Sequence, residues 1–136
     1  MKTFIISIIV ALIMLTGFGF YIYYINNTTR ELSDAVNEIS FLAKENEWEK
    51  CSDKVNDLLD IWREHEKILC SFTDHGDLDE IKRALNELKE SAYYKDKQET
   101  VTYSSVLIVL IERLTENEMP RLENVLKTNT VYNLFA

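Results

Sequence analysis

The sequence predicts an all-α protein: one N-terminal transmembrane helix, followed by a small antiparallel bundle of about four helices. Three observations predict this fold class. The chain opens with an apolar run, Phe4–Ile25, that contains no charged residue. Only three Gly and one Pro occur, and two of the Gly lie inside that run, so few residues interrupt helices elsewhere. After the run, apolar residues recur every three or four positions, which is the spacing of one helix face.

The apolar run is long enough to cross a bilayer. At 1.5 Å per residue, residues 4–25 span roughly 33 Å, and a hydrocarbon core is about 30 Å thick. Tyr21, Tyr23 and Tyr24 crowd its far end, where amphipathic rings favour the membrane–water boundary. A buried core helix would seldom be apolar on every face over this length. We therefore expect residues 4–25 to be a transmembrane signal anchor, with the lipid bilayer as its partner.

A cleavable signal peptide is the alternative for the same run. Gly17-Phe18-Gly19 has the small-x-small spacing of a cleavage site, so cleavage after Gly19 stays open. Signal-peptide apolar regions are shorter, however, at roughly 7–15 residues. The run also continues through Phe20 to Ile25, and cleavage would leave a strongly apolar mature terminus. We expect an uncleaved anchor.

The charges on either side of the run predict its orientation. Lys2 and the terminal amine are positive, whereas Arg30 and Glu31 cancel each other. The positive-inside rule then makes residues 1–3 cytoplasmic. The rest of the chain is expected outside the cytoplasmic membrane, as the exposed part of a single-pass protein.

The composition of the chain is acidic. It has 23 acidic and 15 basic residues, a net charge of −8, and Lys2 precedes the apolar run, so the domain beyond the run is more acidic still. This balance argues against a nucleic-acid partner and against adhesion to anionic lipid headgroups. A negative domain beside a negative leaflet tends to stand off the surface.

The residues beyond the run divide into three parts. Residues 26–29, Asn-Asn-Thr-Thr, are polar and predict a hinge. Residues 30–128 are expected to form the acidic helical bundle, and residues 129–136 a loose C-terminal tail. The first bundle helix carries an apolar stripe of Leu32, Ala35, Val36, Ile39, Leu42 and Ala43.

The clearest helix of the chain comes next. Its apolar and aromatic residues alternate by three and four positions, which is the spacing of a seam that packs along another helix. We predict that this seam is either a packing face or an interaction surface. Its members are Trp48, Cys51, Val55, Leu58, Trp62, His65, Leu69 and Phe72.

Three capping-box patterns predict where helices begin. Each pairs a side-chain acceptor with a carboxylate three residues later. The pairs are Asn46 with Glu49, Asp77 with Glu80, and Asp96 with Glu99. The helix that follows the second pair has a stripe of Leu78, Ile81, Leu85, Leu88 and Ala92.

The last part of the bundle is less regular. The stretch Thr100–Ile111 is rich in β-branched residues and could by itself pass for a strand. An isolated strand among helices has nothing to pair with, so we expect a central, well-buried helix. Pro120 fits the first turn of a short final helix that bears Leu122, Val125 and Leu126. Short connections throughout imply antiparallel neighbours, hence an up-down bundle.

A polar cluster at Asp74, His75 and Asp77 is a weak candidate for a divalent-metal site. Its spacing matches neither a calcium loop nor a zinc motif. Acidic residues also favour the start of a helix through the helix dipole. We therefore expect a corner that connects two helices, with no metal and no cofactor.

One histidine and two cysteines complete the reactive side chains of interest. We expect His65, on the seam, to be buried or half-buried with a hydrogen-bond partner; a pH-dependent switch is the alternative. Cys51 and Cys70 are roughly 28 Å apart if their helix is continuous, too far for an internal disulfide.

Several landmarks have the layout of a known family. They are Phe4–Ile25, Asn46-Glu47-Trp48-Glu49, Trp62, Asp74-His75, Leu78-Asp79-Glu80-Ile81 and Leu122-Glu123-Asn124-Val125-Leu126. On these residues the chain resembles a family of small single-span proteins of spore-forming Gram-positive bacteria, domain of unknown function 4363. The resemblance implies a membrane-anchored helical protein paired with another membrane protein, and it supplies no catalytic or binding residues.

Two classes of function fit these expectations. The first is a non-catalytic interaction or structural protein, anchored in the membrane and acting with a membrane partner. The alternative is an extracytoplasmic sensor that binds a small ligand or responds to pH through a buried His. An apolar cavity lined by Trp62 and His65 would favour the sensor. We do not expect an enzyme, because no nucleophile, cofactor loop or closed metal set is visible.

Overall fold

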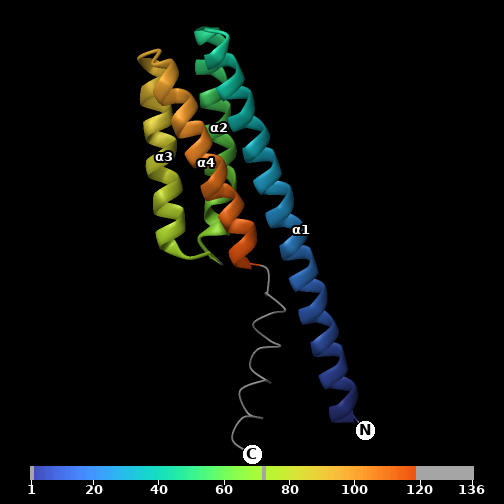
Figure 1. Ribbon diagram of the computed structural model, residues 1–136. Coiled ribbons are helices and arrows are strands. Elements are labelled where there is room, and N and C mark those ends of the chain that lie inside the picture. Colours follow the sequence, from blue (N-terminus) through green and yellow to red (C-terminus); the bar gives the residue numbers. More distant parts are fainter. Residues whose placement is uncertain (1, 72, 119–136) are drawn as a thin grey trace, which may run out of the picture.

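The computed structural model describes residues 2–71 and 73–118 of the 136-residue chain, and it is helical almost throughout (Figure 1). The four helices are α1 (Lys2–Lys44), α2 (Trp48–Leu69), α3 (His75–Tyr93) and α4 (Lys97–Glu118). The described residues contain no strand, so the predicted fold class is confirmed, as is a helix in place of a strand at Thr100–Ile111. The predicted final helix after Pro120, the tail 129–136 and Phe72 lie outside the described residues.

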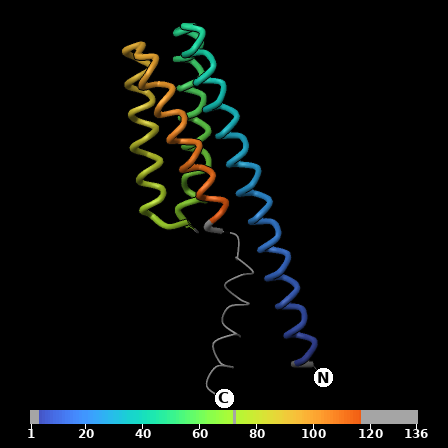
Figure 2. Tube along the Cα trace, in the orientation of Figure 1, coloured from blue at the N-terminus to red at the C-terminus, as the bar shows by residue number. Residues whose placement is uncertain are grey.

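The helices form an up-down-up-down bundle. α1 packs against α2 and α4, and α3 packs against the same two helices, so the four surround one core. Short turns join successive helices, which therefore run in opposite directions, as the trace in Figure 2 shows. The antiparallel arrangement predicted from the short connections is confirmed.

The helix α1 continues without interruption from Lys2 to Lys44, so the predicted hinge at residues 26–29 is wrong. Thr28 and Thr29 are buried, and the Thr29 hydroxyl donates to the carbonyl of Ile25 at 2.9 Å. Asn and Thr are poor helix formers, but tertiary packing overrides that preference here. Ile25 is itself buried, so the packed part of α1 begins before residue 30, the predicted start of the bundle.

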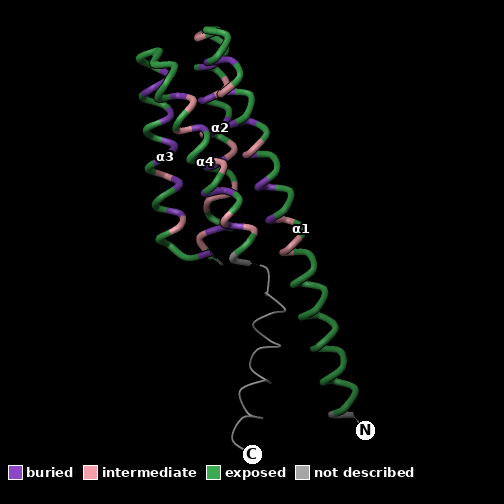
Figure 3. Tube along the Cα trace, in the orientation of Figure 1, coloured by how far each residue is buried: buried purple, intermediate pink, exposed green. Residues whose placement is uncertain are grey.

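The predicted apolar stripes form the core. Every member of the stripe in α1 and of the stripe in α3 is buried, as are five members of the seam in α2. The described seam residues in the core are Cys51, Val55, Leu58, Trp62 and Leu69. Figure 3 shows this division along the helices: buried residues line the inner faces of the bundle, while the N-terminal part of α1 is exposed.

The helix α4 is not the central helix that the sequence predicts. Leu107, Ile111 and Leu114 are buried, but Val106 is 43% and Val109 57% exposed. In a ring of four helices, each has two neighbours and one face towards solvent, and α4 contacts α1 and α3. The β-branched residues Val106 and Val109 therefore lie on its solvent-facing side.

Two helix ends at the same end of the bundle use left-handed residues. Asn46 has φ 61° and Lys95 has φ 58°. Glu47 N–H donates to Leu42 and Asp96 N–H donates to Ser91, the six-residue closure of a Schellman motif. Asn46 therefore ends α1, and the predicted capping box of Asn46 with Glu49 is wrong.

The other two capping predictions have different outcomes. Asp96 accepts from the Glu99 N–H at 3.0 Å, so the predicted cap of α4 is confirmed. Asp77 is not a cap, because α3 already begins at His75 and the capping side chain is Asp74, which accepts from the Gly76 N–H at 2.6 Å. The capping-box pattern thus pointed to Asp77, one turn after the true cap Asp74, because any Asp near the start of a helix can offer the same spacing.

Candidate functional site

The exposed N-terminal part of α1 is the most distinctive surface of the molecule. Residues Phe4–Phe20, called the shaft below, are exposed on every face. Among the described residues, α1 is the one helix long and apolar enough to cross a membrane, and none of its most apolar stretch is buried by the rest of the chain. The shaft thus has the length and composition of a membrane span.

The predicted seam is a packing face rather than an open surface. Val55, Leu58 and Leu69 are buried between neighbouring helices, and Trp48 is half-buried at the start of α2. Of the two alternatives for the seam, the structure shows packing. Trp62 is 4% exposed but still lines a surface groove.

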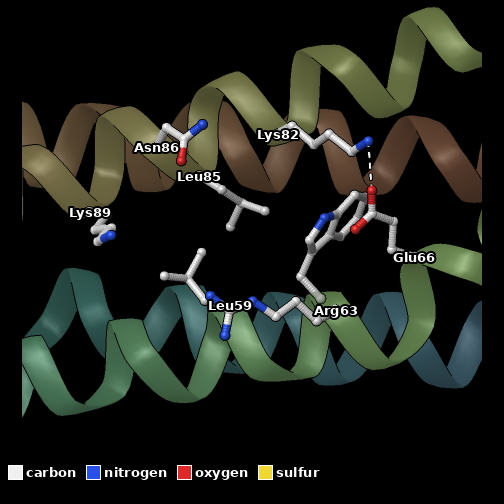
Figure 4. Close-up of a pocket in the computed structure, with 8 residues that line it drawn as sticks. Leu59, Arg63, Glu66, Lys82, Leu85, Asn86 and Lys89 are labelled. Carbon is white, nitrogen blue, oxygen red and sulfur yellow. Dashed lines mark ion pairs between the residues drawn. The ribbon is translucent and has the colours of Figure 1, made fainter.

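That groove lies between α2 and α3 (Figure 4). It has a volume of about 360 Å³, and Leu59, Trp62 and Leu85 supply its apolar surface. Its remaining lining residues are polar or charged: Arg63, Glu66, Lys82, Asn86 and Lys89. Three cations against one carboxylate make this lining positive on a chain whose net charge is −8.

Two of the three cations in the groove already have acidic partners. Lys82 Nζ lies 2.6 Å from Glu66 Oε1, and this hydrogen bond raises the pKa of the Lys82 ammonium. Arg63 Nη1 lies 2.8 Å from Oδ1 of Asp60, on its own helix. These exposed pairs are worth little to stability, so their side chains can turn towards another anion at small cost.

His65 lies on the side of α2 that faces α1. Its Nδ1 is 2.6 Å from the Tyr24 hydroxyl, and its Nε2 is 3.6 Å from Glu31 Oε2. The expectation of a half-buried histidine with a hydrogen-bond partner is confirmed. Trp62 lines the groove between α2 and α3 whereas His65 does not, so this groove is not the cavity lined by both residues that would favour a sensor.

The polar cluster predicted after α2 does not gather around one point. Asp74 caps α3, His75 is an exposed residue of its first turn, and Asp77 lies 3.5 Å from Arg113 of α4. Glu80 also contacts Arg113, at 3.1 Å. No group of three His, Cys, Asp or Glu within the described part of the chain is placed to hold a metal ion.

Sequence reasoning missed the partners that these side chains have. Tyr24 was assigned to a membrane boundary belt, and Arg113 was not singled out. The pairs Tyr24–His65 and Arg113–Asp77 join residues that are 41 and 36 positions apart. Nothing in local spacing could have found them.

The two cysteines have different surroundings. Cys51 is buried and its thiol lies 3.8 Å from the carbonyl of Ile39, whereas Cys70 is half-buried after the end of α2. Both are free. Burial raises the pKa of the Cys51 thiol, which makes it a poor nucleophile at neutral pH.

Comparison with known families gives a match over most of the chain. A family described as "Domain of unknown function (DUF4363)" matches residues 19–125. The match begins where the shaft ends, so it covers the bundle and the packed half of α1. No curated protein and no solved structure matches the chain.

Proposed function

The chain belongs to the family described as a domain of unknown function (DUF4363), and from that premise we propose that it is a membrane-anchored, non-catalytic helical protein that acts with a membrane partner. The bundle is displayed outside the cytoplasmic membrane, and α1 is both anchor and bundle helix. The observation that carries the proposal is the continuity of α1 from the exposed shaft into the core.

The shaft supports a lipid environment on energetic grounds. Exposed apolar surface costs about 25 cal/mol per Å² in water, and the shaft exposes large side chains on every face. In a bilayer the same surface is favourable, and the backbone bonds are satisfied within the helix. An uncleaved anchor is favoured, because cleavage after Gly19 would cut α1 just before the turn that packs into the core.

The α2–α3 groove is the place where we expect the partner to bind. A partner segment with an apolar side chain over Trp62 and carboxylates near Lys82 and Lys89 would complement both its floor and its charge. An acidic amphipathic helix has this chemistry. The rest of the acidic surface would repel such a segment, which directs it to the groove.

The anchor and its orientation are tested with one labelled variant. Glu49→Cys, in a Cys70→Ser background, places a thiol on the exposed start of α2, while the buried Cys51 stays unreactive. We expect the protein to remain in the membrane pellet at alkaline pH and to react in intact cells with a maleimide that cannot cross membranes. Release at alkaline pH contradicts the anchor, and labelling only after lysis contradicts the orientation.

The partner is tested by photocrosslinking from the groove. A photoreactive amino acid replaces Asn86 on the groove, and in a matched variant it replaces Asn37 on the exposed face of α1. We expect one reproducible adduct from position 86 that disappears in Lys82→Glu/Lys89→Glu. An adduct of the same mass from both positions, or none from position 86, contradicts binding in the groove.

A sensor that responds to pH is the second candidate, and it would act through the contacts of His65 with α1, although these contacts satisfy both forms of the imidazole. A neutral His65 accepts from Tyr24 at Nδ1, and a protonated one donates there while pairing with Glu31. Both forms are thus satisfied, which weakens the case for a switch. If His65→Gln abolished a change in melting temperature between pH 5 and pH 7.5, the sensor would be supported instead.

A further inference from the structure

We propose that the bundle does not stand clear of the bilayer: its lower end sits within the outer headgroup layer and contacts lipid directly. The contact surface, called the base below, consists of described residues at the end of α2 and the start of α3: Ile68, Cys70, Ser71, Asp74 and His75. This inference rests on the proposed membrane anchor and adds a second partner, the lipid surface, to it.

The level of the base along α1 follows from the contact between α1 and α2. Tyr24 and His65 are level with each other, because their side chains are in contact at 2.6 Å. From His65, α2 runs antiparallel to α1 and ends at Leu69, roughly 6 Å nearer the N-terminus of α1. The same distance along α1 leads from Tyr24 to Phe20. The end of α2 is therefore level with the end of the shaft, and the base lies there too, as Figure 1 shows.

The shaft is slightly shorter than the hydrocarbon core of a bilayer is thick. Phe4–Phe20 rises roughly 26 Å, whereas the hydrocarbon core is about 30 Å thick. An ordinary helix tilt of about 20° shortens the vertical reach further. The next residue, Tyr21, packs against the bundle core. The shaft therefore has no residues to spare as a spacer between the hydrocarbon and the bundle.

The base lies at the depth of the lipid headgroups. A bilayer is about 40–45 Å thick with its headgroups, so each headgroup layer is roughly 5–7 Å deep. A base level with the end of a fully used shaft lies inside that layer. The mismatch of a few ångströms is relieved by thinning of the bilayer, at a modest cost.

The chemistry of this level suits an interface. Tyr23 is 69% exposed on α1, one turn above Phe20, and amphipathic rings favour this depth. Ile68 is 44% exposed at the end of α2, while Ser71 and Asp74 are polar and exposed. The Asp74 carboxylate of the base and the net negative charge of the chain favour zwitterionic over anionic headgroups. The negative charge, from which we expected the domain to stay away from the membrane, thus determines which headgroups it contacts. The length of the shaft determines the distance between the bundle and the bilayer.

The test uses three variants of the full chain in vesicles of dioleoylphosphatidylcholine, each with one introduced, accessible cysteine that carries an environment-sensitive fluorophore; Cys51 is kept because it is buried. Ser71→Cys reports the base, Glu49→Cys reports the far end of α2, and Leu12→Cys reports the shaft; Cys70 is Ser in all three. The first two probes are on the same side of the bundle and roughly 33 Å apart. Spin-labelled lipids carry the quencher either on the headgroup or in the acyl chain.

We expect headgroup quencher to reduce the signal at position 71 and acyl-chain quencher to reduce it at position 12, with neither affecting position 49. Quenching at position 71 should increase in lipids with longer acyl chains, because a thicker core draws the base closer. Position 71 unquenched beside a quenched position 12 overturns the inference and leaves the anchor intact. Position 12 unquenched overturns the anchor as well.

A spacer variant separates contact at the base from accidental proximity. Insertion of a polar helical heptad, Glu-Ala-Ala-Lys-Glu-Ala-Lys, between Phe20 and Tyr21 adds roughly 10 Å to α1 while nearly keeping the helix face. We expect headgroup quenching at position 71 to be lost, with the melting temperature of the bundle unchanged. Quenching that persists in the spacer variant overturns the inference.

Discussion

The two halves of α1 belong to one helix but have opposite surroundings. From Phe4 to Phe20 every residue is exposed, whereas from Ile25 to Ala43 one stripe is buried and the opposite face is exposed. The first half is apolar on all faces; the second is amphipathic, with Asn37 and Glu38 on its outer side. No break in the backbone separates them.

This difference shows that the helix itself does not decide its surroundings. Backbone hydrogen bonding is the same in both halves, and only the distribution of apolar side chains changes. The amphipathic stripe of α1 is covered by the neighbouring helices α2 and α4, whereas a helix that is apolar all round requires lipid or a larger protein interior. Equal substitutions in the two halves should therefore have unequal effects, and in different assays.

The largest expected effect separates the halves by stability. Ile39→Ala removes a fully buried side chain from the packed half and should lower the free energy of unfolding by about 4 kcal/mol. Ile9→Ala, the same change in the shaft, should alter it by less than about 0.5 kcal/mol. Denaturant unfolding in micelles, followed by the fluorescence of Trp48 and Trp62, measures both. Similar losses from both variants would mean that the shaft also packs on protein.

The second effect separates the halves by membrane insertion. Leu12→Arg places a charge in the shaft and should cost about 3 kcal/mol of insertion free energy, since Leu is favourable and Arg unfavourable at the centre of a span. Asn37→Arg adds the same charge to the outer face of the packed half and should change nothing. The fraction recovered in the membrane pellet measures both. An unchanged pellet fraction for Leu12→Arg would contradict a spanning shaft.

Much of the packed half could be predicted, because its information is local. The stripe from Leu32 to Ala43 and the seam from Cys51 to Leu69 repeat every three or four residues, and each apolar member is buried while His65 is half-buried. The exposed shaft was likewise visible as an apolar run. Periodicity identifies the inward face of a helix whatever its neighbours are.

What could not be predicted depends on neighbours. The hinge at residues 26–29 was inferred from their polarity, but Thr28 and Thr29 are buried and the segment is helical. The central position of α4 was inferred from hydrophobicity, which does not say how many helices a face will meet. The α2–α3 groove is lined by residues of two helices, and no pattern along one helix records how far apart the two lie.

A smaller effect is expected in the turn between α3 and α4, at the end of the bundle where α1 also ends. Lys95 holds a left-handed conformation without the side-chain advantage of Asn46, the corresponding residue of the other turn. Lys95→Gly should raise the free energy of unfolding by about 0.5–1 kcal/mol, and Asn46→Gly by less. Thermal melting of the bundle measures the change, and the pellet fraction should not move. A loss of stability in Lys95→Gly would mean that this side chain makes a contact that matters more than the strain.

The last effect is a pH dependence of the packed half that the shaft cannot share. Burial raises the pKa of Cys51, whose thiol lies beside the Ile39 carbonyl of α1. The folded state thus keeps its proton at a pH where the unfolded thiol, with an ordinary pKa of about 8.5, has lost it. Because the unfolded state then binds fewer protons, stability falls as pH rises past that value, by at most about 1.4 kcal/mol per pH unit.

Unfolding free energies between pH 7.5 and pH 9.5 measure this slope. Cys51→Ala should be less stable throughout, since it leaves a small cavity, but its stability should decline less over that range. Cys70→Ser is the matched control, because Cys70 is only half-buried, and it should keep the full decline. An equal slope in Cys51→Ala and the parent protein would assign the decline to other groups. A slope carried by Cys51 would instead show that the contact between α2 and the packed half of α1 persists until the whole bundle unfolds.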